Sequence, residues 1–213
     1  PLGASPGLFS TASVLLVKDV DDWNAVLDTA QLEVGLHYRL CVDGDGSGPL
    51  QEGDAGWSVF LSSMVSHTIL ARPGGTRVGV VMSCLVEGAC HRETQVMLAD
   101  DCQVPRLQGA ETNVGHSGRD SWFANVPIVG LEPGLYYSLC VDLDGDFGKL
   151  QFGSSSSVLY LSPLLSALAT IKPVAHQAPF VVMCATGANC SVVSEAFLVD
   201  VAAINVVDMD KGC

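Results

Sequence analysis

Two pairs of segments repeat along this chain at an almost constant distance. Residues 23–43 align without a gap on residues 122–142 at an offset of 99, and both carry Trp, Leu-Glu, Gly-Leu, Tyr and Leu-Cys-Val-Asp at the same places. Residues 80–90 align on residues 180–190 at an offset of 100, with two cysteines at the same spacing. Self-similarity at a fixed period is typical of chains built from structural repeats. The 213 residues therefore predict two units of about a hundred residues.

Short apolar runs bounded by Gly, Pro, Asp or Ser predict β-strands along most of the chain. Runs of four to eight residues rich in Val, Leu, Tyr and Phe are typical of strands. The expected strands are Ser13–Val17, His37–Val42, Ser58–Ser62, Thr68–Ala71, Arg77–Cys84, Thr94–Leu98, Trp122–Val129, Tyr136–Val141, Ser157–Leu161, Phe180–Cys184 and Ala196–Val201. Helical periodicity is nearly absent. The pattern predicts an all-β fold of tandem antiparallel β-sandwiches.

The segment Leu131–Tyr137 reads Leu-Glu-Pro-Gly-Leu-Tyr-Tyr and precedes one of the expected strands. It resembles the corner before the penultimate strand of fibronectin type III and immunoglobulin-like domains. In that family a tyrosine hydroxyl bonds back to the chain across the corner. The resemblance implies this structural role for Tyr137. The segment Leu32–Tyr38 keeps Leu, Gly and Tyr but lacks Pro, which implies the same role for Tyr38.

Cys140 departs from the immunoglobulin pattern, because it lies three residues after Tyr137 rather than two. Side chains three positions apart on a strand face opposite ways. We therefore expect Tyr137, Leu139 and Val141 in the core and Cys140 outside it. Cys140 and its equivalent Cys41 are thus poor candidates for the disulfide that joins the two sheets of immunoglobulin domains.

The strand order of this family predicts one complete sandwich at residues 67–163. Residues 1–66 then hold only the closing strands of a unit, and residues 164–213 only the opening strands. Three arrangements remain open. The chain is cut from a longer array, or its two ends together form a second sandwich, or permuted units follow one another as serial domains at 1–92 and 93–213.

Eight cysteines fall into two sets of four at equivalent positions. The sets are Cys84, Cys90, Cys102 and Cys140, and Cys184, Cys190, Cys213 and Cys41, where Cys213 matches Cys102 only loosely. The even number in each set favours disulfides, and disulfides predict a secreted or cell-surface protein. Local closure of Cys84–Cys90 and Cys184–Cys190 is one pairing among many.

Two acidic loops follow the aligned Leu-Cys-Val segments. Their candidate ligands are Asp43, Asp45, Ser47 and Asp54 in the first loop and Asp142, Asp144 and Asp146 in the second. Oxygen side chains at alternate positions are the register of calcium-binding loops. The sequence thus predicts calcium as a cofactor, more strongly at the first loop, because Phe147 replaces the register's glycine in the second. The alternative is a polar hairpin loop in which Asp-Gly pairs only make the turn.

The charge balance excludes several classes of partner. Ten Lys and Arg against 23 Asp and Glu, a net charge of −13, leave no basic field for nucleic acid. No stretch approaches the ~20 apolar residues that a transmembrane helix needs. No nucleophile elbow, phosphate-binding loop or histidine cluster is present, so we do not expect an enzyme. The Asn189-Cys-Ser sequon is a weak glycosylation candidate.

Low charge and high apolarity, 15% and 48% of the residues, are expected where modules bury faces against neighbours. The sequence therefore predicts extracellular structural or adhesion repeats of a larger surface or filament protein, whose partners are neighbouring protein modules. The alternative is a carbohydrate- or protein-binding receptor module. Trp57 and the loop at 103–120 are its candidate contacts. Trp23 and Trp122, which are equivalent, are expected in the core.

Overall fold

The computed structural model describes residues 11–46, 48–71, 75–118, 120–169, 180–185, 188 and 190–195. Strands make up its regular structure, and the described ranges contain no α-helix. One 3₁₀ turn, η1 (Gly145–Phe147), interrupts the second acidic loop. No helix among these residues is both long enough and apolar enough to cross a membrane.

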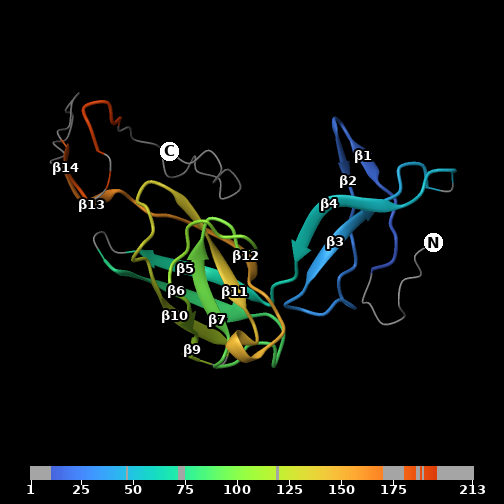
Figure 1. Cartoon of the computed structure of the whole chain (residues 1–213), viewed down its shortest axis with the longest axis horizontal. Helices are drawn as coiled ribbons and strands as arrows, with labels where there is room; N and C mark the ends of the chain where they lie inside the picture. Colours follow the sequence, from blue (N-terminus) through green and yellow to red (C-terminus); the bar gives the residue numbers. More distant parts are fainter. Residues whose placement is uncertain are drawn as a thin grey trace.

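Two four-stranded sheets form the centre of the molecule (Figure 1). The first contains, in order, β5 (Met64–Ala71), β6 (Arg77–Cys84), β10 (Ser121–Pro127) and β9 (Gly115–His116). The second contains β12 (Gly153–Tyr160), β11 (Tyr136–Asp142), β7 (Gln95–Ala99) and β8 (Thr112–Asn113). Every pairing in them is antiparallel. The prediction of an all-β, antiparallel fold is confirmed.

The main core lies between these two sheets. Tyr137 and Leu139 alternate along β11 and are fully buried, as are Val80 and Met82 along β6. Alternate residues of a strand face the same side of a sheet, so this pattern brings the apolar faces of the two sheets together. Burying one such side chain contributes about 1.5–3 kcal/mol.

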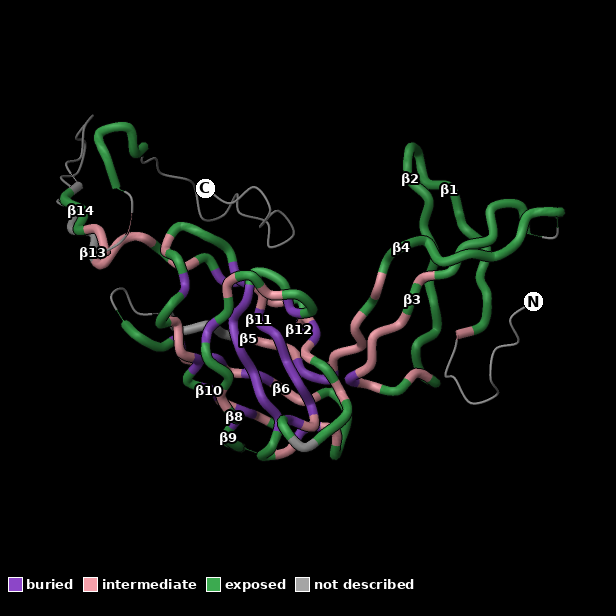
Figure 2. The backbone as a smooth tube through the Cα atoms, in the orientation of Figure 1, coloured by how far each residue is buried: buried purple, intermediate pink, exposed green. Residues whose placement is uncertain are grey.

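Three two-stranded hairpins complete the described structure. They are β1 (Val17–Asp19) with β2 (Asp22–Asn24), β3 (His37–Val42) with β4 (Gly53–Phe60), and β13 (Leu164–Ala169) with β14 (Phe180–Cys184). The β3–β4 and β13–β14 hairpins lie at opposite ends of the central sheets (Figure 1). Buried residues concentrate in the centre, whereas most of each end is exposed or only partly buried (Figure 2).

The prediction that both equivalent tryptophans lie in a core is wrong for Trp23. Trp122 is buried on β10, directly opposite Met82 on β6. Trp23 lies on β2, whose one strand neighbour is β1, and it is exposed. Trp122 packs in the core between the two four-stranded sheets, whereas the described residues around Trp23 form only hairpins and place no strand equivalent to β6 beside β2.

Candidate functional site

Three disulfides lie within the described residues. They join Cys84 to Cys90, Cys102 to Cys140, and Cys184 to Cys190. The first and third close equivalent loops after β6 and β14. Cys41 is exposed and is the one described cysteine outside a disulfide. Cys213 lies outside the described residues. Disulfide bonding, predicted from the number of cysteines, is thus confirmed for these six.

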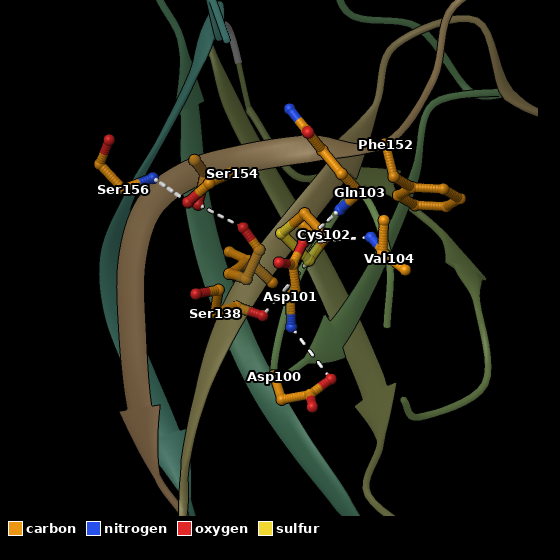
Figure 3. Close-up of a disulfide and its surroundings, with 12 residues drawn as sticks. Asp100, Asp101, Cys102, Gln103, Val104, Ser138, Phe152, Ser154 and Ser156 are labelled. Carbon is orange, nitrogen blue, oxygen red and sulfur yellow. Dashed lines mark hydrogen bonds between the residues drawn. A yellow bond between two sulfur atoms is a disulfide. The ribbon is translucent and has the colours of Figure 1, made fainter. Parts of the chain in front are cut away.

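The Cys102–Cys140 disulfide lies on the outer face of the second sheet. Cys140 points away from the core, and it packs with Met97 and Ala99 of β7 beneath Cys102. Phe152 covers the edge of this cluster. The disulfide therefore holds the loop at 100–107 against the outside of the sheet (Figure 3).

Two carboxylates organise this loop from within. Asp100 Oδ1 and Asp101 Oδ1 each accept hydrogen bonds from backbone N–H groups further along the loop. Figure 3 shows the bonds to Asp101 and the bond that the Asp101 N–H donates to Asp100. The donors are Arg106 at 2.9 Å and Leu107 at 3.0 Å for Asp100, and Gln103 at 2.7 Å and Val104 at 3.1 Å for Asp101. The N–H of Leu107 is the main cause that lowers the pKa of Asp100. The loop is therefore fixed in shape by its own acidic residues.

Gln103 joins this loop to the N-terminal hairpin. Its Nε2 lies 2.7 Å from His37 Nδ1 and 2.7 Å from Ser58 Oγ. His37 Nε2 lies 3.0 Å from the carbonyl oxygen of Phe152. Because a carbonyl only accepts, the geometry fits a neutral His37 that donates from Nε2 and accepts at Nδ1. The β3–β4 hairpin is thus bonded both to Phe152, the residue before β12, and to the loop.

An open groove of about 420 Å³ lies at this junction. The residues that line it include Arg39 and Trp57 of the hairpin and Asp100, Asp101 and Gln103 of the loop. Trp57 is largely exposed. Sequence reasoning singled out Trp57 and the 103–120 loop separately as contact candidates, and the fold places Trp57 and Gln103 in the same groove.

In the first acidic loop the carboxylates bond to the backbone of the loop. Asp43 Oδ1 accepts the N–H groups of the residues two and three positions on, at 3.2 and 3.1 Å. Asp45 Oδ2 accepts the N–H of Leu50 at 3.1 Å. Asp54, the predicted twelfth-position ligand, forms an exposed ion pair with Arg39 at 3.8 Å. This loop is exposed to solvent.

The second acidic loop repeats this bonding in a buried setting. Asp142 Oδ1 accepts the N–H groups of Asp144 and Gly145, both at 3.2 Å. Asp144 Oδ2 accepts those of Lys149 at 2.7 Å and Leu150 at 3.2 Å. Asp142 is buried, and Asp144 Oδ1 is a buried oxygen without a hydrogen-bond partner. This loop therefore contains a buried carboxylate oxygen that accepts no hydrogen bond.

The pKa values of the two carboxyl groups in the second loop are shifted in opposite directions. Burial, helped by the neighbouring Asp144, raises the pKa of Asp142 to about 6. Burial also pushes the pKa of Asp144 upward, but the N–H of Leu150, the Asp142 carboxyl and the N–H of Lys149 outweigh it and lower that pKa. Between the lowered pKa of Asp144 and about pH 6, the pair therefore holds a proton on Asp142 and a charge on Asp144.

The remaining predicted ligands are dispersed. Asp146 is exposed, and Ser47 and Asn189 lie outside the described residues. Across the described ranges, no group of three or more His, Cys, Asp or Glu side chains gathers closely enough to hold a metal ion.

We expect the stability of the protein to fall as the pH rises from about 4 to about 6. Native Asp142 has a pKa of about 6, against 3.8 for an ordinary aspartate, so in this window the folded chain binds more protons than the unfolded chain. Stability then decreases with pH, by on the order of 1–2 kcal/mol across the window. Asp144 acts in the opposite sense but at lower pH, because its pKa is lowered. Urea unfolding at a series of pH values measures the change.

Asp142→Asn should flatten this pH profile, because the amide is neutral and keeps an oxygen to accept the N–H groups of Asp144 and Gly145. Asp43→Asn, at the exposed equivalent position, should leave the profile unchanged. Parallel profiles for the wild type and Asp142→Asn would contradict the expectation.

The Tyr137 hydroxyl closes the turn before β11. It donates to the carbonyl of Glu132 at 3.0 Å and accepts the N–H of Glu132 at 2.8 Å. Burial is the main cause that raises the pKa of Tyr137. Tyr38 makes the same two bonds to Glu33, at 2.9 and 2.8 Å, in the turn before β3. The same pair of tyrosine hydrogen bonds therefore stabilises both turns.

Tyr137→Phe should lower the free energy of unfolding by about 1–2 kcal/mol, because it leaves two backbone groups without their partner beside the core. Tyr38→Phe should cost less than about 0.5 kcal/mol, since water reaches the same groups at the exposed turn. Urea unfolding of the two variants gives the comparison. Equal decreases in the free energy of unfolding for the two variants would show that burial does not determine how much these hydrogen bonds stabilise the fold.

No protein-family model, curated protein or solved structure matches this chain. What can be said of its function therefore rests on its own residues.

Proposed function

We propose that this chain is an extracellular structural or adhesion module, built from disulfide-stabilised β-sandwich repeats of the immunoglobulin-like or fibronectin type III kind, and that it has no enzymatic activity. The observation that carries the proposal is the Cys102–Cys140 disulfide, which ties a loop to the outer face of a sheet. Disulfides at such structural positions persist in oxidising compartments. A secreted or cell-surface location follows from this chemistry.

Two hairpins of the same geometry support the repeat part of the proposal. In β3–β4, Tyr38 pairs with Val59, and in β11–β12, Tyr137 pairs with Leu159. Both hairpins shift register at the same point, just before Cys41 and just before Cys140. Duplicated units are expected to share such details, here a bulge at the same position and the same pair of tyrosine hydrogen bonds. Neighbouring modules of the same kind are therefore the proposed partners.

Surface labelling of intact cells with an antibody against this chain tests the location. We expect labelling without permeabilisation, together with non-reducing peptide maps that contain Cys102–Cys140. Labelling only after permeabilisation, with the same cysteines recovered as free thiols, would overturn the proposal.

The groove supports a second candidate function, which is binding of a carbohydrate. The exposed indole of Trp57 offers a stacking face, and Asp101 and Gln103 offer polar groups beside it. We expect a glycan array to give ligands whose binding falls at least about tenfold in Trp57→Ala. Trp23→Ala, which removes another exposed tryptophan, should leave binding unchanged. An array without ligands, or an equal loss in both variants, would exclude this function.

Calcium is the cofactor we propose for the acidic loops; because no three acidic side chains of the described residues converge on one point, main-chain carbonyl oxygens would have to supply the further ligands. Asp144 Oδ1 is buried and unpartnered, and carboxylate oxygens are the ligands that calcium prefers. We expect the melting temperature to be higher in calcium than in chelator, because binding at 100 times Kd stabilises the native state by about 2.7 kcal/mol. Asp144→Asn should remove most of the difference and Asp43→Ala/Asp45→Ala the rest. Equal melting temperatures in calcium and chelator would exclude it.

A further inference from the structure

Apolar side chains that are buried in the central sheets have exposed equivalents at both ends of the molecule. Trp122, Met82 and Leu159 are 8%, 0% and 9% exposed, whereas the residues at equivalent positions, Trp23, Val182 and Val59, are 61%, 47% and 54% exposed. Trp23 lies on β2 and Val182 on β14, at different ends of the chain. Each end therefore presents half of a core that is complete in the centre.

The two halves are complementary rather than alike. The N-terminal end holds equivalents of the closing strands, since β3–β4 matches β11–β12 in sequence and register. The C-terminal end holds equivalents of the opening strands, since β13–β14 matches β5–β6 and is followed by the same short disulfide loop. In the centre, opening and closing strands cover each other. Among the described residues, each end thus lacks the strands that the other end has.

The two ends do not meet within one molecule, because they lie at opposite ends of the central sheets (Figure 1). We propose that copies of this chain associate head to tail, with β13–β14 of one copy packing over the β3–β4 hairpin of the next and pairing edge to edge with its Trp23 strand. The inference rests on the proposed structural function and names the partner as a second copy. Such a contact is heterologous, so assembly grows into an open fibre or closes into a ring.

The central sheets also specify the register of the contact. Met82 of β6 lies directly opposite Trp122 of β10. At equivalent positions, Val182 of one copy lies opposite Trp23 of the next. The unpaired Cys41 fits this arrangement, because its equivalent Cys140 bonds to Cys102, whose position in the repeat belongs to the C-terminal half.

Light scattering of the full-length chain over a range of concentrations tests the association. We expect the mass to rise from 22.3 kDa to at least twice that value. Val59→Asp and Val182→Asp, each of which blocks one end, should remain monomeric alone but form a one-to-one dimer when mixed. Val129→Asp, at an exposed valine of the centre, should associate like the wild type. A wild type that is monomeric throughout, or mixed variants that do not pair, would overturn the inference.

Engineered cysteines test the register in a Cys41→Ser/Cys213→Ser background. Directly opposed residues of antiparallel strands have Cα atoms close enough for a disulfide. With oxidised glutathione as the electron acceptor, a Trp23→Cys chain should crosslink to a Val182→Cys chain. It should crosslink several-fold less to a Met183→Cys chain, although Met183 is somewhat more exposed than Val182, because residue 183 faces the other side of the strand. Equal yields would overturn the register. Surface labelling of cells is independent of these results, so a monomeric chain leaves the proposed extracellular function standing.

Discussion

Replacing both Cys102 and Cys140 with alanine should lower the free energy of unfolding of the central sheets by about 3–4 kcal/mol. The disulfide closes a loop of 38 residues, and a crosslink of that span removes much of the freedom of the unfolded chain. It also covers the Met97 and Ala99 cluster on the outer face of the sheet. The same loss should free the 100–107 loop, and with it the Gln103 bonds to the N-terminal hairpin.

The matched control is Cys84→Ala/Cys90→Ala, which opens a loop of only six residues. We expect it to cost about 2 kcal/mol, because closure entropy grows with the logarithm of the loop length. Chemical unfolding followed by tryptophan fluorescence, in which the buried Trp122 reports on the central sheets, measures both variants. A decrease in the free energy of unfolding that is equal or larger in Cys84→Ala/Cys90→Ala would contradict the expectation that Cys102–Cys140 is the more stabilising disulfide.

Local periodicity predicted the elements that carry a strong two-residue alternation or a β-branched run. The strands at His37–Val42, Arg77–Cys84 and Phe180–Cys184 have the predicted bounds at both ends. Alternation also gave the direction of Tyr137 and Leu139, which fill the core as expected. The predicted strand Ala196–Val201 lies outside the described residues.

Other strands escaped prediction because their pairing is decided by a partner strand. Residues of β13 read Leu-Leu-Ser-Ala-Leu-Ala, without a β-branched residue, and Leu and Ala favour helices when nothing else decides. Pairing with β14 overrides this preference. The two-residue strands β8 and β9 are too short to leave a pattern in the sequence.

The candidate site was predictable only in pieces. The acidic loops and Trp57 stand out in the sequence, but Asp100 and Asp101 as organisers of the disulfide loop do not. The tendency of Asp to bond to the backbone N–H two or three residues on is a signal for Asp101 alone, because the N–H groups of Arg106 and Leu107 that bond to Asp100 lie six and seven residues on. The groove joins residues separated by 45 and 66 positions, as in the Gln103 bonds to Ser58 and His37, and no local pattern reports such contacts.

Leu139→Ala should lower the free energy of unfolding by about 3–4 kcal/mol, because it leaves a cavity in the main core. Leu139 is fully buried between the two sheets, where the neighbouring strands cannot move in to fill the space. Urea unfolding measures the loss. Leu139→Met, which nearly conserves volume, should cost less than about 1.5 kcal/mol. Similar losses in both variants would mean that the cavity is not the cause.

Leu40 is the equivalent of Leu139 on β3, and it is only partly buried. At a concentration where the chain is monomeric, Leu40→Ala should therefore cost less than about 1 kcal/mol, since little apolar area is lost. At a concentration where copies associate head to tail, Leu40 becomes covered as Leu139 is, and the cost should rise toward that of Leu139→Ala. Unfolding measured at both concentrations thus distinguishes whether β3 stays exposed or becomes part of a core shared by two copies. A cost for Leu40→Ala that stays small at every concentration would mean that the face of β3 remains uncovered.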